Sequence, residues 1–287
     1  MHKLAKLEPV LWGSLILVVS QVFTIYIAFR EKDFVEANRI TTPDISLQYT
    51  VIYFFIVVII MGLILFLIPV YRLRFVFRII FALMFSWGVF IVLGLTLPVL
   101  AAAIISAAAG LLWLFIPLVW LHNLLLIVTL VGVGSAFGFL MSPWTAMSFM
   151  LLISIYDVVA VRFGYTVWMA KELSESDTLP VFVLPRRISY WKLNLRKSGF
   201  RDLFHDKSAE REFSILGGGD IGFPLLLVVS VFFAYNFASS IIVAVFSLLG
   251  LISAFVIQMV FLKEKPMPAL PPISFLSLIG LLIVYLL

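Results

Sequence analysis

Residues 238–262, ASSIIVAVFSLLGLISAFVIQMVFL, form a run of 25 residues without a charged side chain. About 20 predominantly apolar residues of α-helix cross the hydrocarbon core of a bilayer. Lipid offers no hydrogen-bond partner to a free backbone group, so only helices and closed barrels span a membrane. The run lacks the regular polar alternation of a barrel strand. It therefore predicts a transmembrane helix.

The rest of the chain has the same character. Of its 287 residues, 63% are hydrophobic and only 12% are charged, and the mean hydropathy of +1.18 fits no soluble class of protein. The chain contains no Cys, so disulfides and zinc-thiolate sites are excluded. These values predict an all-α, polytopic membrane protein in a lipid bilayer.

Eight further segments resemble the first in length and composition, giving nine predicted transmembrane helices. Their approximate ranges are 9–29, 47–71, 75–95, 97–116, 118–140, 144–170, 213–236, 238–262 and 268–287. Several boundaries are marked only by proline, asparagine, serine or glycine. The one long polar connection, 171–212, divides a single membrane domain into a six-helix part, 1–170, and a three-helix part, 213–287. Within it, residues 178–184 are apolar and β-prone, as expected of an interfacial loop or of a segment that docks substrate.

The positions of Lys and Arg predict the orientation, because cytoplasmic loops carry the excess of basic residues. With nine helices, sixteen of the twenty Lys and Arg fall on the side of the N-terminus, and only three fall on the other side. The N-terminus and the 171–212 loop are therefore expected in the cytoplasm, with the C-terminus opposite. A net charge of +5 distributed in this way calls for no nucleic-acid partner.

Thirteen of the fifteen acidic residues lie in loops or near helix ends, which leaves Asp157 and Asp220 inside predicted helices six and seven. An intramembrane carboxylate costs at least a few kcal/mol, so it usually faces the protein interior and serves a function. Each Asp is expected about seven residues, or roughly 10 Å, from the cytoplasmic end of its helix. On antiparallel neighbouring helices, the two carboxylates can meet.

Two facing carboxylates in a low dielectric share one proton and titrate as a pair. Such a pair suits peptide hydrolysis, in which the ionised member activates a water and the protonated member donates to the developing oxyanion. No metal or other cofactor is required. Intramembrane carboxylates also line ion pathways, so a proton-coupled transporter or cation channel is the alternative. In that case His122 could join a relay, although a single His near a helix end is more typical of packing.

Other motifs accompany the aspartates. Tyr156 precedes Asp157, and Gly217-Gly218-Gly219-Asp220 should loosen its helix and allow a close backbone approach. The last predicted helix begins with Pro268-Ala269-Leu270-Pro271-Pro272. Prolines suit a first helical turn, but their density here also leaves backbone groups for an extended peptide to pair with. Gly134 and Gly138 suit close helix packing.

These three motifs, in this order with a long loop after the first, resemble the presenilin and signal peptide peptidase family. The Pro-Ala-Leu-Pro run and the cytoplasmic N-terminus are more similar to presenilin, and to its archaeal homologues, than to signal peptide peptidase. The resemblance implies an intramembrane aspartyl protease of the Gly-x-Gly-Asp type with Asp157 and Asp220 catalytic. It implies supporting or substrate-binding roles for Tyr156, Gly217, Gly219, Pro268, Ala269 and Leu270. Single-span membrane proteins or peptides are the expected substrates, and the pattern leaves a homo-oligomer open.

Overall fold

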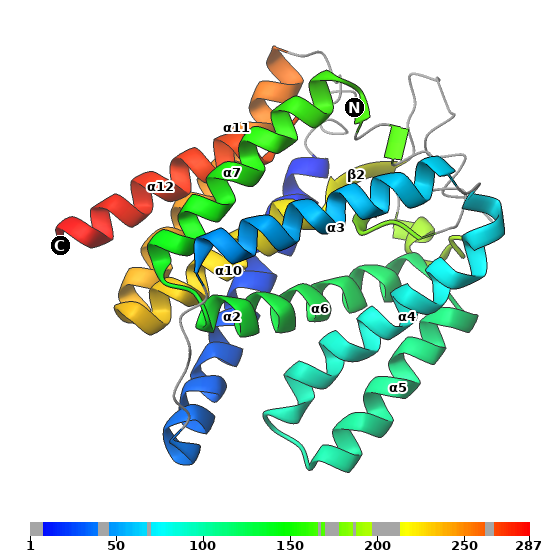
Figure 1. Cartoon of the computed structure of the whole chain (residues 1–287), viewed down its shortest axis with the longest axis horizontal. Coiled ribbons are helices and arrows are strands. Elements are labelled where there is room, and N and C mark those ends of the chain that lie inside the picture. Colours follow the sequence, from blue (N-terminus) through cyan, green and yellow to red (C-terminus); the bar gives the residue numbers. More distant parts are fainter. Residues whose placement is uncertain are drawn as a thin grey trace. The chain divides into compact units, whose positions relative to one another are not determined.

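The structure is a computed structural model that describes residues 8–39, 46–67, 70–165, 168–169, 178–185, 188–196, 213–261 and 267–287 (Figure 1). Most of the 171–212 loop lies outside these ranges. The described residues contain nine α-helices, one for each predicted apolar segment: α2 (Glu8–Asn38), α3 (Leu47–Leu67), α4 (Val70–Gly94), α5 (Val99–Phe115), α6 (Val119–Phe139), α7 (Pro143–Arg162), α10 (Gly218–Ala234), α11 (Phe237–Val260) and α12 (Leu270–Leu286).

Six of these helices are long and apolar enough to cross a membrane, namely α2, α3, α4, α6, α7 and α11. The other three, α5, α10 and α12, are apolar but have only 17 residues each, or about 25 Å of helix. The predicted helical class is confirmed, while the crossing of the bilayer by all nine helices stays a prediction.

The weakly marked helix boundaries are confirmed, and each has a local cause. Pro98 precedes α5 as its N-cap residue. The Ser142 side chain accepts a hydrogen bond from the Thr145 N–H at the start of α7, and Asn236 does the same for Ser239 at the start of α11. These caps satisfy backbone donors that have no partner inside the helix. Short uncharged turns are therefore enough to separate consecutive helices.

Several predicted helices have different ends in the structure. The second and third were expected at 47–71 and 75–95, but α3 ends at Leu67 and α4 begins at Val70. The sixth was expected to reach residue 170, but α7 ends at Arg162, and Gly164 follows with a φ of +72°. Glycine adopts this left-handed conformation without strain, which is why it commonly terminates helices. The first predicted helix was expected to end at residue 29, but α2 continues through the charged residues that follow and ends at Asn38.

The seventh predicted helix begins five residues later than expected, because residues 213–217 form a strand. This strand, β2 (Phe213–Gly217), pairs antiparallel with β1 (Val181–Pro185), with Val181 opposite Gly217 and Pro185 opposite Phe213. The β-prone stretch of the loop thus forms most of β1. The helix α10 follows β2 without a connecting loop.

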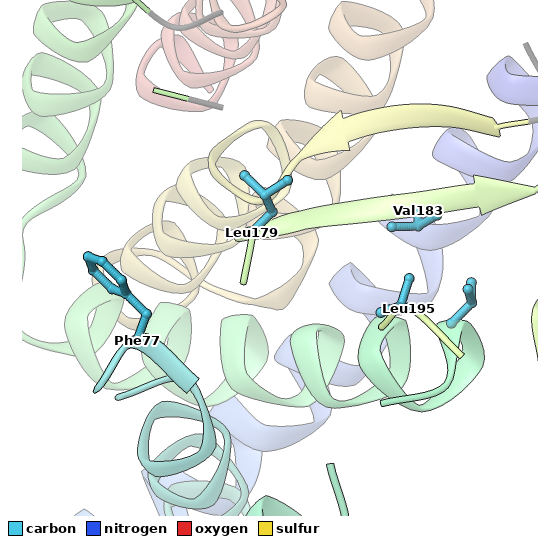
Figure 2. Close-up of a cluster of buried hydrophobic side chains, with 5 residues drawn as sticks. Phe77, Leu179, Val183 and Leu195 are labelled. Atoms are coloured by element: carbon cyan, nitrogen blue, oxygen red, sulfur yellow. The ribbon is translucent and has the colours of Figure 1, made fainter. Parts of the chain in front are cut away.

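The chain divides into two compact units, which are described separately. Unit 1 comprises residues 1–12, 55–129 and 165–218. Within it, α4 and α5 pack as an antiparallel pair (Figure 1). A buried apolar cluster joins α4, α6 and the segment 178–196 through Phe77, Val119, Leu179, Val183 and Leu195 (Figure 2).

Two buried polar residues of α6 bind the backbone of β1 in unit 1. The Asn123 side chain donates to the Val183 carbonyl at 2.7 Å and accepts from the Val183 N–H at 3.0 Å. The fully buried His122 accepts from the Trp113 indole at Nδ1 over 3.2 Å, so its Nε2 carries the proton toward the Val181 carbonyl, 3.0 Å away. The structure therefore supports packing as the role of His122.

Unit 2 comprises residues 13–54, 130–164 and 219–287. Its helices α7 and α11 both pack against α12 (Figure 1). Small residues permit close approach: a Cβ at Gly138 would lie 2.6 Å from the Leu226 carbonyl oxygen on α10, and one at Gly250 would lie 2.5 Å from the Ile273 Cα on α12. Gly134 also faces Leu225, so the predicted role of Gly134 and Gly138 in packing is confirmed.

Candidate active site

Both aspartates and the start of the proline-rich helix lie in unit 2. Asp157 lies in α7, five residues before its end at Arg162. Asp220 is the third residue of α10, not about seven residues into a helix as expected, because β2 takes the preceding residues. Both residues are half-buried.

Asp157 contacts the Pro-Ala-Leu motif directly, since its carboxylate accepts a hydrogen bond from the Leu270 N–H. Leu270 is the first residue of α12, where backbone N–H groups have no partner inside the helix. The next two residues, Pro271 and Pro272, have no N–H at all. Among the first three residues of α12, only Leu270 therefore has an N–H, and this group donates to Asp157.

A second polar contact joins α7 and α12 one helical turn away. Ser154, three residues before Asp157, has its hydroxyl oxygen 3.1 Å from that of Ser274, four residues after Leu270. Both serines are buried. The Ser274 hydroxyl also lies 3.0 Å from the Pro271 carbonyl oxygen, to which it donates.

The first turn of α10 places Asp220 beside flexible backbone. Gly218 and Gly219 precede it, and Pro224 lies within the helix. Because proline has no N–H, it cannot donate the usual hydrogen bond to the carbonyl of the residue four positions earlier, which is Asp220. One helical hydrogen bond is therefore missing where Asp220 is attached, as expected from the glycine and proline pattern.

Aromatic contacts connect the helices that carry the two aspartates. Phe149 of α7 and Phe223 of α10 meet edge to face with their ring centroids 5.7 Å apart. Phe54 packs on Phe149 at 5.6 Å and on Tyr156 at 6.2 Å. Tyr156 thus packs against Phe54 of α3, which also contacts Phe149, while its expected support of the catalytic pair stays a prediction.

The remaining predicted site residues have the following positions. Gly217 is the last residue of β2, opposite Val181, and the next residue, Gly218, donates its N–H to the Pro180 carbonyl at 2.8 Å. Gly219 is exposed at the start of α10. Pro268 and Ala269 are half-buried immediately before α12, and Ala269 caps that helix without a side-chain hydrogen bond.

The described ranges hold no cluster of three His, Asp or Glu side chains arranged as metal ligands. The arrangement instead offers two carboxylates on neighbouring helices, one of them oriented by a backbone donor. Sequence patterns pointed to Leu270 through the proline motif. They gave no reason to single out Ser154 or Ser274, because a buried serine in a membrane helix carries no distinctive signal.

Comparisons with known proteins identify the family and the fold. The family model described as "Signal-peptide peptidase, presenilin aspartyl protease" matches residues 14–287. No individual curated protein matches significantly. Two crystal structures of a presenilin-family intramembrane aspartate protease, in space groups C222 and P2, share the fold at 18% sequence identity. Their TM-scores are 0.61 and 0.58, and the matches cover 96% and 95% of this chain and 96% of each structure. The chain therefore belongs to the signal-peptide peptidase and presenilin family of aspartyl proteases.

Proposed function

We propose that Asp157 and Asp220 are the catalytic pair of this chain, which is an integral, multi-pass membrane protein and an intramembrane aspartyl protease. The observation that carries the assignment is the hydrogen bond from the Leu270 N–H to the Asp157 carboxylate. It connects two of the three sequence motifs through a contact between polar groups. The third motif, with Asp220, lies on α10, which packs on α7 through Phe149 and Phe223.

The chemistry follows from two carboxyl groups that share one proton. The ionised carboxylate removes a proton from a water molecule as the water attacks the scissile carbonyl carbon, and the protonated carboxyl donates to the developing oxyanion. The Leu270 N–H occupies one oxygen of Asp157 and fixes the orientation of that group. Its other oxygen then faces a defined direction for the water or the shared proton.

The strand-to-helix junction before Asp220 corresponds to the Gly-x-Gly-Asp subtype of these enzymes. Gly217 ends β2 and Gly219 lies in the first turn of α10. Neither residue has a side chain, so an extended peptide can approach the backbone next to Asp220. Gly217 and Gly219 are therefore assigned to substrate access, together with Pro268, Ala269 and Leu270 at the start of α12.

The proposed substrates are single-span membrane proteins or peptides, because both aspartates lie in apolar helices of a membrane protein. Self-association of the chain is compatible with its exposed apolar helices. The comparisons give the transporter alternative no support, since the matching family consists of proteases.

Purified full-length protein in detergent or lipid vesicles is expected to cleave a single-span peptide into two defined products. Cleavage should continue in the presence of a metal chelator and without ATP, because two carboxyl groups and a water suffice. Mass spectrometry of the products measures the reaction and identifies the cleaved bond. Absence of products, combined with a proton or cation flux across the vesicle membrane, would contradict the proposal and favour the transporter.

The orientation is part of the proposal and rests on the distribution of Lys and Arg. It assigns the N-terminus and the 171–212 loop to the cytoplasm and the C-terminus to the opposite side. The chain contains no Cys, so single-cysteine variants can be labelled without background. Thr96, in the turn between α4 and α5, and Lys192, in the 3₁₀ helix η1 (Ile188–Lys192), are both exposed.

Thr96→Cys is expected to react with a membrane-impermeant maleimide in intact cells. Lys192→Cys should react only after the membrane is permeabilised. Mass-tagging of the labelled protein on a gel measures both reactions. The reverse pattern would overturn the orientation without touching the catalytic assignment.

A further inference from the structure

The helices α7 and α12 run antiparallel, and three contacts at successive levels fix their register. The Asp157 carboxylate meets the Leu270 N–H at the start of α12. The Ser154 and Ser274 hydroxyls meet one turn further along. Near the other end, Trp144 packs edge to face on Tyr285 at 5.6 Å. The serine contact is therefore the polar contact adjacent to Asp157.

Register matters more in a membrane than in water. Lipid tails are as apolar as leucine side chains, so the hydrophobic effect does not hold one transmembrane helix against another. Close packing and interhelical hydrogen bonds set the alignment instead. The serine hydroxyls provide such a bond between α7 and α12, one turn from Asp157.

Ser274 is the donor in both of its hydrogen bonds. Its hydroxyl carries one proton, which two acceptors share: the Ser154 hydroxyl oxygen at 3.1 Å and the Pro271 carbonyl oxygen at 3.0 Å. Ser274 thus connects α7 to the proline turn itself, within four residues of the N–H that binds Asp157.

The opposite side of the same turn is also fixed. A Cβ at Gly250 of α11 would lie 2.9 Å from the Pro272 carbonyl oxygen, so α11 packs directly on the backbone of this turn. With α11 on one side and Ser154 on the other, the proline turn has little freedom to shift. The Leu270 N–H is held in place as a result.

We propose that Ser154 and Ser274 are positioning residues for catalysis, which keep the Leu270 N–H aligned with the Asp157 carboxylate through the hydrogen bond between α7 and α12. The proposal rests on the proposed function of Asp157. The serines are not expected to touch substrate, so their loss should slow the chemical step without weakening substrate binding.

A double-mutant cycle tests the pair. Ser154→Ala and Ser274→Ala are each expected to lower kcat about tenfold, with KM within about twofold of the wild-type value, because each removes the hydrogen bond between the two helices. The double variant should lose no more than either single variant, because the same hydrogen bond is broken in all three. The measurement is steady-state cleavage of the single-span peptide at a temperature where every variant is folded.

Two matched controls separate positioning from general packing. Ser277 lies on α12 three residues after Ser274, is fully buried, and has no hydrogen-bond partner among the described residues. Ser247 on α11 is equally buried and donates only within its own helix, to the Val243 carbonyl. Ser277→Ala and Ser247→Ala are expected to leave kcat within about twofold of wild type.

The proposal would be overturned if the losses of kcat in the two single variants multiplied in the double variant. Unchanged kcat values in the single variants would also overturn it, and so would an equal loss of kcat in Ser277→Ala. An increase in KM at constant kcat would also overturn it, by placing the serines in substrate binding. An Asp157→Asn variant in the same assay keeps the two hypotheses apart. If Asp157→Asn remains active, the proposed function fails. The serine variants are compared with the wild-type enzyme alone, so their kcat values test the positioning role separately from the Asp157→Asn result.

Discussion

Replacement of either Asp157 or Asp220 by asparagine is expected to abolish peptide hydrolysis, with kcat falling by at least about 10³-fold. Asparagine has nearly the same shape as aspartate and keeps a side-chain oxygen that can accept the Leu270 N–H. It can neither remove a proton from water nor donate one to an oxyanion at neutral pH. Loss of a general acid or base alone typically costs 10²–10⁴-fold, and both roles depend on the shared proton.

Single-turnover cleavage of the single-span peptide measures this effect, since it detects residual rates that steady-state assays miss. Asp33→Asn is the matched control, because Asp33 is exposed in the last part of α2. It should retain wild-type activity. Thermal unfolding of all three variants shows whether a loss of activity reflects misfolding. Appreciable cleavage by either Asp157→Asn or Asp220→Asn would remove that residue from the catalytic pair.

Helix positions could be predicted from the sequence because each boundary has a local cause. Pro98, Ser142 and Asn236 mark helix starts whose caps involve neighbouring residues only. The start of α10 could not be predicted in the same way. Residues 213–217 are apolar enough to continue a membrane helix, and they form a strand because β1, about 30 residues earlier, pairs with them. That pairing is a long-range contact.

The candidate site also has some features that the sequence predicts and others that depend on long-range contacts. Asp157 and Asp220 stand out because charged residues are rare in membrane helices, and the proline motif stands out because four prolines fall within residues 266–272. The donor to Asp157 was not predictable, since it depends on how α7 aligns with α12. Ser154 and Ser274 were not predictable either, because the chain has other buried serines that bond only within their own helices, such as Ser106 and Ser247. Only the three-dimensional arrangement distinguishes the interhelical pair.

The second large effect is expected from the two hydrogen bonds between Asn123 of α6 and Val183 of β1. Asn123 is 2% exposed and satisfies both backbone groups of Val183, which is itself fully buried. Leucine has a similar size but no polar atoms, so Asn123→Leu leaves the Val183 N–H and carbonyl without these partners. Each buried unsatisfied group costs about 1–3 kcal/mol. The variant is therefore expected to lose about 2–6 kcal/mol of unfolding free energy.

Hydrogen exchange and thermal unfolding together locate this loss. The Val183 amide should exchange much faster in Asn123→Leu, and the amides of β2 should follow, because β1 is the pairing partner of β2. Asn236→Leu provides the matched control: it removes an exposed helix cap, which typically costs about 1 kcal/mol, and should leave exchange in β1 unchanged. Equal destabilisation by the two variants, or slow exchange at Val183 in Asn123→Leu, would show that the side chain of Asn123 does not hold the strand. Since β2 continues directly into the helix that carries Asp220, a loosened β1 is also expected to lower cleavage activity, and Asn236→Leu is not.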